Sequence, residues 1–544
     1  MKEVIIIGSG ISGMTCAVRC AELGLHVTLV SPFPSERSQS VMAAGGINAV
    51  TDTPEEGDSV ASHIEDTLKG GCGLGGEKAV RGLCESAGEI LRFLERIGTV
   101  FSVDENGNSA RRSFGGQSHK RTYYCGSSTG KQIVSALVME VRRFEAAGLI
   151  CRKLWYCFHS ALIRGGICYG ALLFNEAVGG LEAMYADALV MATGGQNALF
   201  GKTTGSTQCD GYAAGKLFTQ GVVLKNLEFI QYHPTTLETP QKRMLISEAV
   251  RGEGGRLFYL ENDRRVYFME EKYGPKGNLM TRDIVSREID STGKEVFLDI
   301  SFLDRRTIES RLPEVMEVCK KYRKLDITKD PIPVAPSVHF FMGGIAVHMD
   351  HETSIKNLFA IGECASMYHG ANRLGGNSLL AAIYGGNTAA KAIAKRGPAQ
   401  AVPDFQDETE RENEALKKRL DTDSPFPVMY IRDMLSEIMK KRLGIAREEE
   451  SLHEGLREVD YLLSIADRIR YDNSVLPYFN YSLTGILTLA RAVLCCALTR
   501  KESRGAHFRI DYPAPDELLR CSTLISYDNG HYRVTMDRGK AYEG

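Results

Sequence analysis

The hydrophobic pattern at the start of the chain predicts a strand, a helix and a second strand. Val4–Ile7 is a continuous apolar run, which is typical of a strand that is buried on both faces. An apolar-periodic stretch follows and ends near Gly24, and His26–Val30 again has the pattern of a strand. We therefore expect a β–α–β unit that opens a parallel sheet.

Later apolar runs predict further strands and then helices. Val190–Ala192 and Ala360–Ile361 are short apolar runs that end at glycines, as expected of strands that return to one sheet. Asn377–Lys395 has a helical pattern, with Asn377 or Ser378 as the expected N-cap. Beyond it the chain is charged, and long helices are expected as far as Arg500. Their apolar positions recur at helical spacing: Leu452, Leu456, Val459 and Leu463.

The turn after the first strand carries a glycine motif, Gly8-Ser9-Gly10-Ile11-Ser12-Gly13. In a β–α–β frame this pattern predicts dinucleotide binding: Gly8 makes the turn, Gly10 lets a pyrophosphate approach the backbone, and Gly13 lets the helix pack on the strand. Ser31 stands where an acidic residue is usual after the second strand. The motif therefore does not choose between nucleotides.

Three more stretches are candidates for contact with the cofactor. A loop of small residues with paired glycines follows the first unit, and we expect it to lie along the cofactor; a surface turn is the alternative. Its candidate contacts are Ser38, Gln39, Ser40, Ala44, Gly45 and Gly46. The strand end at Thr193 and Gly194 is a second candidate. Glu363 is a third, either as a ligand for a ribityl or ribose hydroxyl or as a surface carboxylate.

One histidine and one arginine stand within glycine-rich stretches that otherwise read as core. His339 lies in Pro336–Ile345, and Arg373 lies in His369–Leu379. An arginine fork matches a carboxylate, and a helix that begins nearby favours negative charge. We expect a carboxylate substrate and an anionic cofactor ring to meet here.

Composition excludes several classes of protein. The chain has 66 Lys and Arg against 68 Asp and Glu, so its net charge of −2 gives no pull toward nucleic acid. No apolar run reaches the roughly 18 residues of a membrane span, and we see no signal peptide or twin-arginine leader, so a cytoplasmic location is expected. The 14 cysteines are scattered without a CxxC pair. We expect reduced, buried thiols, and any iron–sulfur centre should belong to another chain.

Four motifs in order resemble the flavoprotein subunit of the succinate dehydrogenase/fumarate reductase family over nearly the whole chain. They are HPT at His233–Thr235, SEAVRGEGG at Ser247–Gly255, HFFMGG at His339–Gly344 and GANRLGGNSL at Gly370–Leu379. The resemblance implies an α/β fold: a Rossmann-like FAD-binding domain with an inserted α+β capping domain and a C-terminal helical domain. The expected boundaries are 1–228 and 334–400 for the FAD-binding domain, 229–333 for the capping domain, 401–504 for the helical domain and 505–544 for a tail.

The resemblance also implies an activity, the interconversion of fumarate and succinate with hydride transfer from N5 of FAD. By resemblance the substrate carboxylates are held by His233, Ser247, His339 and Arg373. Arg282 matches the proton donor, although Arg282 and Asp283 alone would suit a surface ion pair. Glu248 and Arg251 match the proton relay. The remaining implied FAD contacts are Phe158, Asp210, Ser378 and Leu379.

Two positions separate this chain from relatives. Gln39 stands where a histidine attaches FAD covalently in some members, so we expect non-covalent FAD, a lower flavin potential and a preference for fumarate reduction. L-aspartate oxidase also holds FAD non-covalently, but it carries a glutamate for the substrate amine where this chain has Phe114. We therefore place a dicarboxylate without an amine first, and L-aspartate oxidase or a reductase of another unsaturated acid as the alternatives.

The electron partner is not visible in the sequence. By resemblance we expect an iron–sulfur subunit, with a membrane anchor or another electron-donor subunit beyond it, which would hold the chain at the inner face of the cell membrane. A subunit that only relays electrons or scaffolds a complex is an alternative of a different class. The presence together of His339, Arg373 and Arg282 argues against it.

Overall fold

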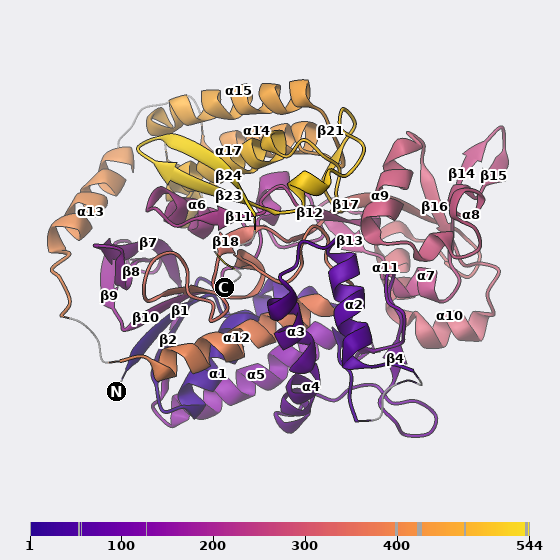
Figure 1. Cartoon of the computed structure of the whole chain (residues 1–544), viewed down its shortest axis with the longest axis horizontal. Helices are drawn as coiled ribbons and strands as arrows, with labels where there is room; N and C mark the ends of the chain where they lie inside the picture. The colour runs from indigo at the N-terminus through magenta and orange to yellow at the C-terminus, as the bar shows by residue number, and fades with distance from the viewer. Residues whose placement is uncertain are drawn as a thin grey trace.

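A parallel sheet forms the base of the structure (Figure 1). The computed structural model describes residues 2–538 and 542, except for 53, 54, 56, 127, 398–400, 421–426, 470, 473 and 474. The strand order is β19-β10-β1-β2-β6, with every pair parallel. These strands are β1 (Glu3–Ile7), β2 (His26–Ser31), β6 (Ile150–Leu154), β10 (Ala188–Met191) and β19 (Leu358–Ala360).

Helices cover this sheet and are continuous with its hydrophobic core. α1 (Ile11–Glu22) packs against both α5 (Thr129–Ala146) and α12 (Asn377–Lys395), which places the first helix beside one that follows it by more than 350 residues. The predicted β–α–β unit is therefore present. The other helices of this part are α2 (Val60–Gly70), α3 (Glu77–Glu85), α4 (Ala87–Arg96) and α6 (Tyr212–Thr219).

Smaller sheets surround the parallel one. An antiparallel sheet consists of β7 (Tyr156–Arg164), β8 (Ile167–Asn175) and β9 (Leu181–Tyr185). A second consists of β3 (Ile47–Asn48), β5 (Thr122–Tyr123) and β4 (Arg111–Arg112). A third, mixed sheet consists of β20 (Ala365–Ser366), β18 (Gly344–Ala346), β11 (Leu224–Lys225), β23 (Ser522–Asp528) and β24 (His531–Asp537).

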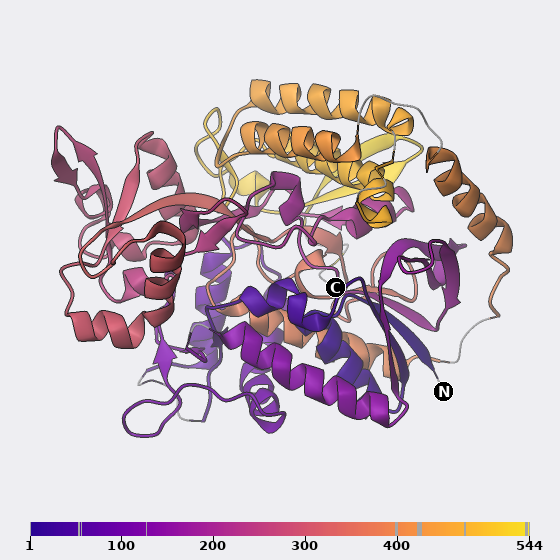
Figure 2. The ribbon, with the colours of Figure 1, turned by 180° about the vertical axis from the view of Figure 1, so that it is seen from behind.

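A separate lobe projects from one side of the molecule and has a hydrophobic core of its own, built from residues between Leu237 and Val334 (Figure 2). Its six strands are β12 (Ile230–Glu238), β13 (Arg243–Leu245), β14 (Arg256–Glu261), β15 (Arg264–Val266), β16 (Val296–Asp299) and β17 (Ile332–Phe341). Its helices are α7 (Ala249–Gly252), α8 (Phe268–Tyr273), α9 (Arg282–Ser291), α10 (Arg305–Arg311) and α11 (Pro313–Arg323). β12 and β17 pair with each other and connect the lobe to the rest of the chain.

Three long helices pack on one another in the C-terminal part: α14 (Val428–Arg442), α15 (Glu449–Ile465) and α17 (Leu483–Thr499). α13 (Gln406–Leu420), which we expected in the same domain, lies apart from them against β9 (Figure 2). Residue 400, the expected end of the FAD-binding domain, lies outside the described residues. The remaining short elements are α16 (Pro477–Tyr481), β21 (Ala446–Arg447) and β22 (Phe508–Arg509).

The end of the described chain returns to the centre of the molecule. β23 pairs with β11, and the preceding loop brings the amide of Ala506 to the carbonyl of Ala371, at 3.0 Å. The fully buried Arg500 secures this loop, because it donates to Glu228 at 2.6 Å and to Glu502 at 2.8 Å. A desolvated charge pair persists only when its hydrogen bonds are made, as they are here.

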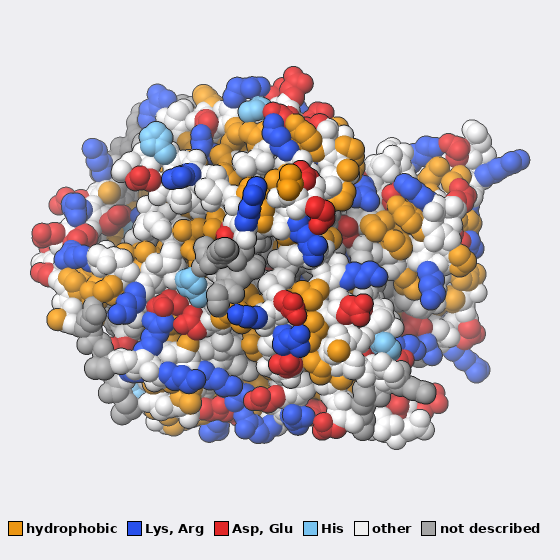
Figure 3. Space-filling view, in the orientation of Figure 1, with side chains coloured by type: hydrophobic (Ala, Val, Ile, Leu, Met, Phe, Trp, Pro, Cys, Tyr) orange, Lys and Arg blue, Asp and Glu red, His pale blue; other side chains and the backbone are white. Residues whose placement is uncertain are grey.

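The surface has no dominant charge. On the face seen in Figure 3, basic and acidic side chains are interspersed, in keeping with the net charge of −2. In the described part of the chain, no helix is both long enough and apolar enough to cross a bilayer. The fourteen cysteines carry free thiols, and most of them are buried.

Candidate active site

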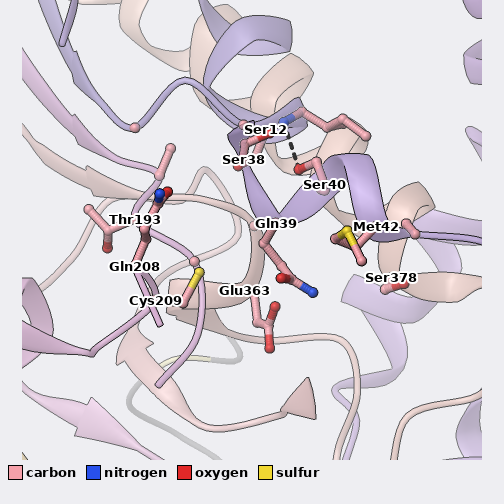
Figure 4. Close-up of a pocket in the computed structure, with 18 of the residues that line it drawn as sticks. Ser12, Ser38, Gln39, Ser40, Met42, Thr193, Gln208, Cys209, Glu363 and Ser378 are labelled. Carbon is pink, nitrogen blue, oxygen red and sulfur yellow. Dashed lines mark hydrogen bonds between the residues drawn. The ribbon is translucent and has the colours of Figure 1, made fainter. Parts of the chain in front are cut away.

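A cavity is lined both by the turn between β1 and α1 and by residues of the projecting lobe, among them Arg243 and Arg282. Figure 4 shows part of its wall. Most of the predicted cofactor contacts lie in its wall: Gly8, Ser9, Gly10, Ile11, Ser12, Ser31, Ser38, Gln39, Ser40, Ala44, Gly45, Gly46, Phe158, Thr193, Gly194, Asp210, Glu363, Arg373, Ser378 and Leu379. These segments are far apart in sequence, and the parallel sheet brings them together.

Gly13 is the one predicted cofactor contact that does not line the cavity. A Cβ at this position would lie 1.9 Å from the carbonyl oxygen of Gly8. Gly13 therefore serves close packing of α1 on the strand, as the motif predicted, and its assignment as a cofactor contact stays a prediction.

Two helices begin at the cavity with a glycine as N-cap, although Ser40 Oγ accepts from the Ile11 amide in the first turn of α1, at 3.1 Å. α1 follows Gly10, and α12 follows Gly376, which has the left-handed φ of 83°. The expected N-cap at Asn377 or Ser378 is wrong, because Gly376 takes that position and the side chain of Asn377 points back to Asn48 and Thr67. Uncapped helix N-termini present amide groups to a ligand and favour negative charge, such as a pyrophosphate or an anionic flavin ring.

Polar atoms without protein partners also face the cavity. Ser38 Oγ and Gln39 Oε1 are buried and have no hydrogen bond, which is unusual unless a ligand supplies one. Gln39 and Glu363 point into the same part of the cavity (Figure 4). Loss of water raises the pKa of the Glu363 carboxyl to about 7, and its Oε1 accepts from the Phe341 amide at 3.1 Å. Glu363 is thus not the surface carboxylate of the alternative interpretation, and the wall suits FAD.

Two arginines meet at the far end of the cavity through one shared acceptor. Gln231 Oε1 accepts from Nη1 of Arg282 at 3.1 Å and from Nη2 of Arg373 at 3.0 Å. Gln231 is fully buried, and its own amide donates to Asn372 Oδ1 at 2.7 Å and to the Arg373 carbonyl at 2.8 Å. Burial, and then the charge of Arg282, hold the pKa of Arg373 well below its ordinary value. Two buried guanidinium groups on one neutral acceptor favour the binding of an anion.

Glu248 connects Arg282 to Arg251. Both Nε and Nη2 of Arg282 donate to Glu248 Oε2, and Nη2 of Arg251 lies 3.6 Å from Glu248 Oε1. Burial alone would raise the pKa of Glu248, but the charges of Arg282 and Arg251 and the Gly115 amide bring it below its ordinary value. Asp283 accepts from Asn372 instead, so the alternative of an Arg282–Asp283 ion pair is wrong. The three predicted proton-transfer residues thus lie in one contiguous chain.

The two histidines lie edge to face, with ring centroids 5.2 Å apart. His339 Nδ1 lies 2.8 Å from Thr204 Oγ1, and His233 bonds locally to the Thr235 carbonyl at 3.1 Å. Burial, and then the charge of Arg282, lower the pKa of both imidazoles well below the usual value, so both rings are neutral hydrogen-bonding groups.

The predicted substrate residues divide into two sets. Phe114, Arg282, His339 and Arg373 line the cavity. His233, Ser247, Glu248 and Arg251 stand behind this wall, and Ser247 Oγ accepts from the Ala249 amide at the start of α7, at 3.2 Å.

Sequence reasoning missed Gln231, Thr204 and Lys242. Lys242 lines the cavity, where Nζ contacts Met42 Sδ at 3.8 Å, and within the described residues no carboxylate pairs with it. Burial lowers the pKa of Lys242. Polar residues in strands carry no special spacing, so only the adjacency of Gln231 to the HPT motif was a usable signal.

Comparisons with known proteins agree with this arrangement. Residues 3–379 match the FAD binding domain family, and residues 432–541 match the fumarate reductase flavoprotein C-terminal family. The chain is 36% identical to the succinate dehydrogenase flavoprotein subunit of Bacillus subtilis, over 95% of this chain and 93% of that one. It is 33% identical to the L-aspartate oxidase of Pseudomonas aeruginosa, over 94% and 95% of the two chains.

The fold comparison gives the same result. The structure superimposes on FrdA from a mutant E. coli quinol fumarate reductase with a TM-score of 0.89 and 29% identity, over 98% of this chain and 96% of that one. The predicted fold class, the FAD cofactor and the family resemblance are confirmed. The chain belongs to the succinate dehydrogenase and fumarate reductase family of FAD-dependent flavoprotein subunits.

Proposed function

We propose that this chain is a catalytic flavoprotein subunit that reduces fumarate to succinate, or runs the reverse reaction. The observation that carries the proposal is the shared Gln231 acceptor, which sets two buried guanidinium groups side by side in the cavity wall. A dicarboxylate matches this charge, and each carboxylate can take bidentate hydrogen bonds from a guanidinium fork. Neutral His339 adds a hydrogen-bonding group to the cavity wall without adding charge, and neutral His233 packs against its ring from behind the wall.

The chemistry assigned to the chain's own residues is positioning and proton transfer. When bound in its reduced form, FAD would supply the hydride that one carbon of the double bond needs. Arg282 gives a proton to the other carbon, so that fumarate gains H⁻ and H⁺ and becomes succinate. Arg282 then regains its proton through Glu248, which it contacts, and through Arg251, which lies next to Glu248. Burial lowers the pKa of Arg251, which makes proton release from this normally very weak acid less costly.

L-aspartate oxidase is the second candidate, because an enzyme of that name is a relative. Phe114 disfavours it: the side chain lines the cavity and is 5% exposed, and an apolar ring offers no counter-charge to a substrate ammonium. Arg112, near the Phe114 ring, would repel one. A reductase of another unsaturated dicarboxylate shares the same charge pattern.

The binding of FAD is proposed to be non-covalent. The amide of Gln39 lies in the cavity wall but cannot form the histidyl bond. Without that bond the flavin potential should be lower, which favours fumarate reduction. Precipitation in acid should therefore leave protein that is colourless and flavin that stays in the supernatant; protein that remains yellow would contradict the proposal.

The electron donor is proposed to be an iron–sulfur subunit. Solved relatives include quinol fumarate reductases, and among the described residues no group of His, Cys, Asp or Glu is suited to holding a metal. A further subunit, a membrane anchor or another donor, would place the chain at the inner face of the membrane.

The decisive assay uses purified holoenzyme with reduced viologen and fumarate, beside L-aspartate and oxygen. We expect fumarate reduction, no aspartate oxidation, and loss of several orders of magnitude in kcat for Arg282→Ala. Turnover of aspartate alone would favour the second candidate, and near-normal fumarate turnover in Arg282→Ala would reject the proton-donor role. A flavin spectrum that does not respond to fumarate would indicate an electron-relay subunit.

A further inference from the structure

The buried side-chain amide of Asn48 joins two segments of the cavity wall, the Gly45–Gly46 loop and the start of α12. Asn48 is the last residue of β3, it is 0% exposed, and it follows the cavity-lining Gly45 and Gly46. Its Nδ2 donates to the Gly375 carbonyl and to Asn377 Oδ1, both at 2.8 Å. Its backbone amide donates to the Gly376 carbonyl at 3.2 Å.

These bonds determine where α12 begins. Gly375 and Asn377 flank Gly376, whose left-handed backbone opens the uncapped first turn toward the cavity. A Cβ on Gly376 would lie 2.0 Å from Asn48 Oδ1, so no other residue fits between Asn48 and the helix. The next two residues, Ser378 and Leu379, are in the cavity wall.

The acceptor side of Asn48 extends toward the substrate. Asn48 Oδ1 accepts from Gln117 Nε2 at 2.9 Å and from Thr122 Oγ1 at 2.6 Å. Gln117 Oε1 in turn accepts from the Phe114 amide at 3.0 Å, and the next amide, that of Gly115, donates to Glu248 at 2.8 Å. All the hydrogen-bonding capacity of the Asn48 side chain is thus used in holding cavity segments.

We propose that Asn48 is a positioning residue for FAD, because it holds the open first turn of α12 against the Gly45–Gly46 loop. Gln117, which also donates to the Gly375 carbonyl at 3.1 Å, positions the Phe114 loop for substrate. The inference concerns the FAD site and does not depend on which acid the enzyme reduces. The competing explanation is that Asn48 is a satisfied core amide that contributes only stability.

The two explanations differ in how FAD affinity responds. In Asn48→Ala the Gly375 carbonyl keeps only its bond from Gln117, and Asn377 Oδ1 keeps only its contact with His63. Two buried hydrogen bonds to the start of α12 are therefore lost, at about 0.5–1.5 kcal/mol each. Because the start of α12 is then free to move, we expect the FAD dissociation constant to rise about 10- to 100-fold. Asn48→Asp keeps the bonds that Oδ1 accepts from Gln117 and Thr122, but its second carboxylate oxygen would face the Gly375 carbonyl and Asn377 Oδ1. The variant should therefore bind FAD as weakly as Asn48→Ala.

The control is Asn175, a buried amide away from the cavity. It donates to Tyr156 and Glu182 and accepts from the Ala177 amide, and it does not line the cavity. Asn175→Ala should lower thermal stability comparably while leaving FAD affinity unchanged. The measurement is the recovery of FAD fluorescence when holoenzyme is diluted, together with the visible spectrum of the flavin that stays bound.

Gln117→Met keeps the proposal testable if Asn48→Ala does not fold. It removes the bond from Gln117 to the Gly375 carbonyl but spares the Asn48 bonds to Gly375 and Asn377, so FAD affinity should fall less than in Asn48→Ala while kcat/KM for the acid falls about tenfold. The inference is overturned if Asn48→Ala loses no more FAD affinity than Asn175→Ala at an equal loss of melting temperature, or if Gln117→Met releases FAD as readily as Asn48→Ala.

Discussion

Arg282 donates twice to the same oxygen of Glu248, from Nε at 3.0 Å and from Nη2 at 2.9 Å. This geometry fixes the guanidinium plane and leaves Nη1 directed to Gln231 and the cavity. The other oxygen of Glu248 is held by the Gly115 amide at 2.8 Å. Glu248 therefore orients the proposed acid and also offers it a route for reprotonation.

Replacement of Glu248 by glutamine tests whether the carboxylate is needed for orientation and reprotonation of Arg282, since the glutamine side chain has almost the same shape. Glu248→Gln keeps the shape but cannot carry a proton as a carboxylate, so we expect kcat for fumarate reduction to fall at least about 100-fold with a small change in KM. Steady-state assays with reduced viologen measure both constants. Glu253→Gln, which removes an exposed partner of Arg311, is the control. Unchanged kcat in Glu248→Gln would exclude the relay.

The neutral amide of Gln231 should matter for substrate binding, because it lies between two cationic side chains and leaves their positive charge available to the substrate. Gln231→Leu leaves two buried guanidinium groups without their acceptor, and kcat/KM should fall about 10- to 100-fold. Gln231→Glu restores the acceptor but adds a negative charge between the arginines, so KM should rise more steeply than in the leucine variant because the carboxylate competes with substrate. Equal KM values in the two variants would show that charge at this position is unimportant.

Lys242, in the cavity wall, should attract the anionic substrate. Lys242→Gln removes a cation that no carboxylate neutralises in the described structure, and kcat/KM at low ionic strength should fall several-fold. The difference should shrink as salt is added, because screening weakens the attraction. Lys320→Gln, on the exposed face of α11, should have no effect. A loss that is independent of salt would indicate a contact role instead.

Glu363 should make the FAD-free protein less stable as pH rises. Its pKa is about 7 in the folded chain against 4.5 for a free carboxyl, so between these values the folded state keeps a proton that the unfolded state has released. The unfolding free energy should fall through this window by up to roughly 3 kcal/mol.

The corresponding variant is Glu363→Gln, which removes the buried charge and keeps an acceptor for Phe341. It should match the parent at pH 5 and be more stable at pH 8, as measured by urea unfolding of FAD-free protein. Glu317→Gln is the surface control. Parallel pH curves for parent and Glu363→Gln would exclude a raised carboxyl pKa.

The sequence predicted those parts of the site that local chemistry dictates. The glycine motif requires a turn and close packing, so Gly8 and Gly13 could be assigned from the β–α–β pattern. Arg373 could be singled out because a charged side chain amid glycines and apolar residues is costly without a purpose, whereas Arg282 and Arg251 were assigned by resemblance to the family.

Other parts depend on contacts between distant segments. Gln231 became recognisable as a bridge only when β12 paired with β17 and brought it to Arg373. Asn377 looked like an N-cap because such side chains usually bond to their own helix, but Asn48 and Thr67 compete for it from more than 300 positions away. No repeating pattern of residues in the sequence predicts these contacts.

The buried Arg500–Glu228 pair and the contact of Ala506 with Ala371 have a consequence for biosynthesis. The segment that carries Arg373 rests on a loop that is translated more than 100 residues later. During synthesis on the ribosome, the glycine motif and the parallel strands can assemble early, but the arginine cannot take its final place until this loop has emerged. A nascent or prematurely terminated chain should therefore fold its nucleotide-binding part but have no catalytic activity. An incomplete chain would then not react with metabolites in the cell.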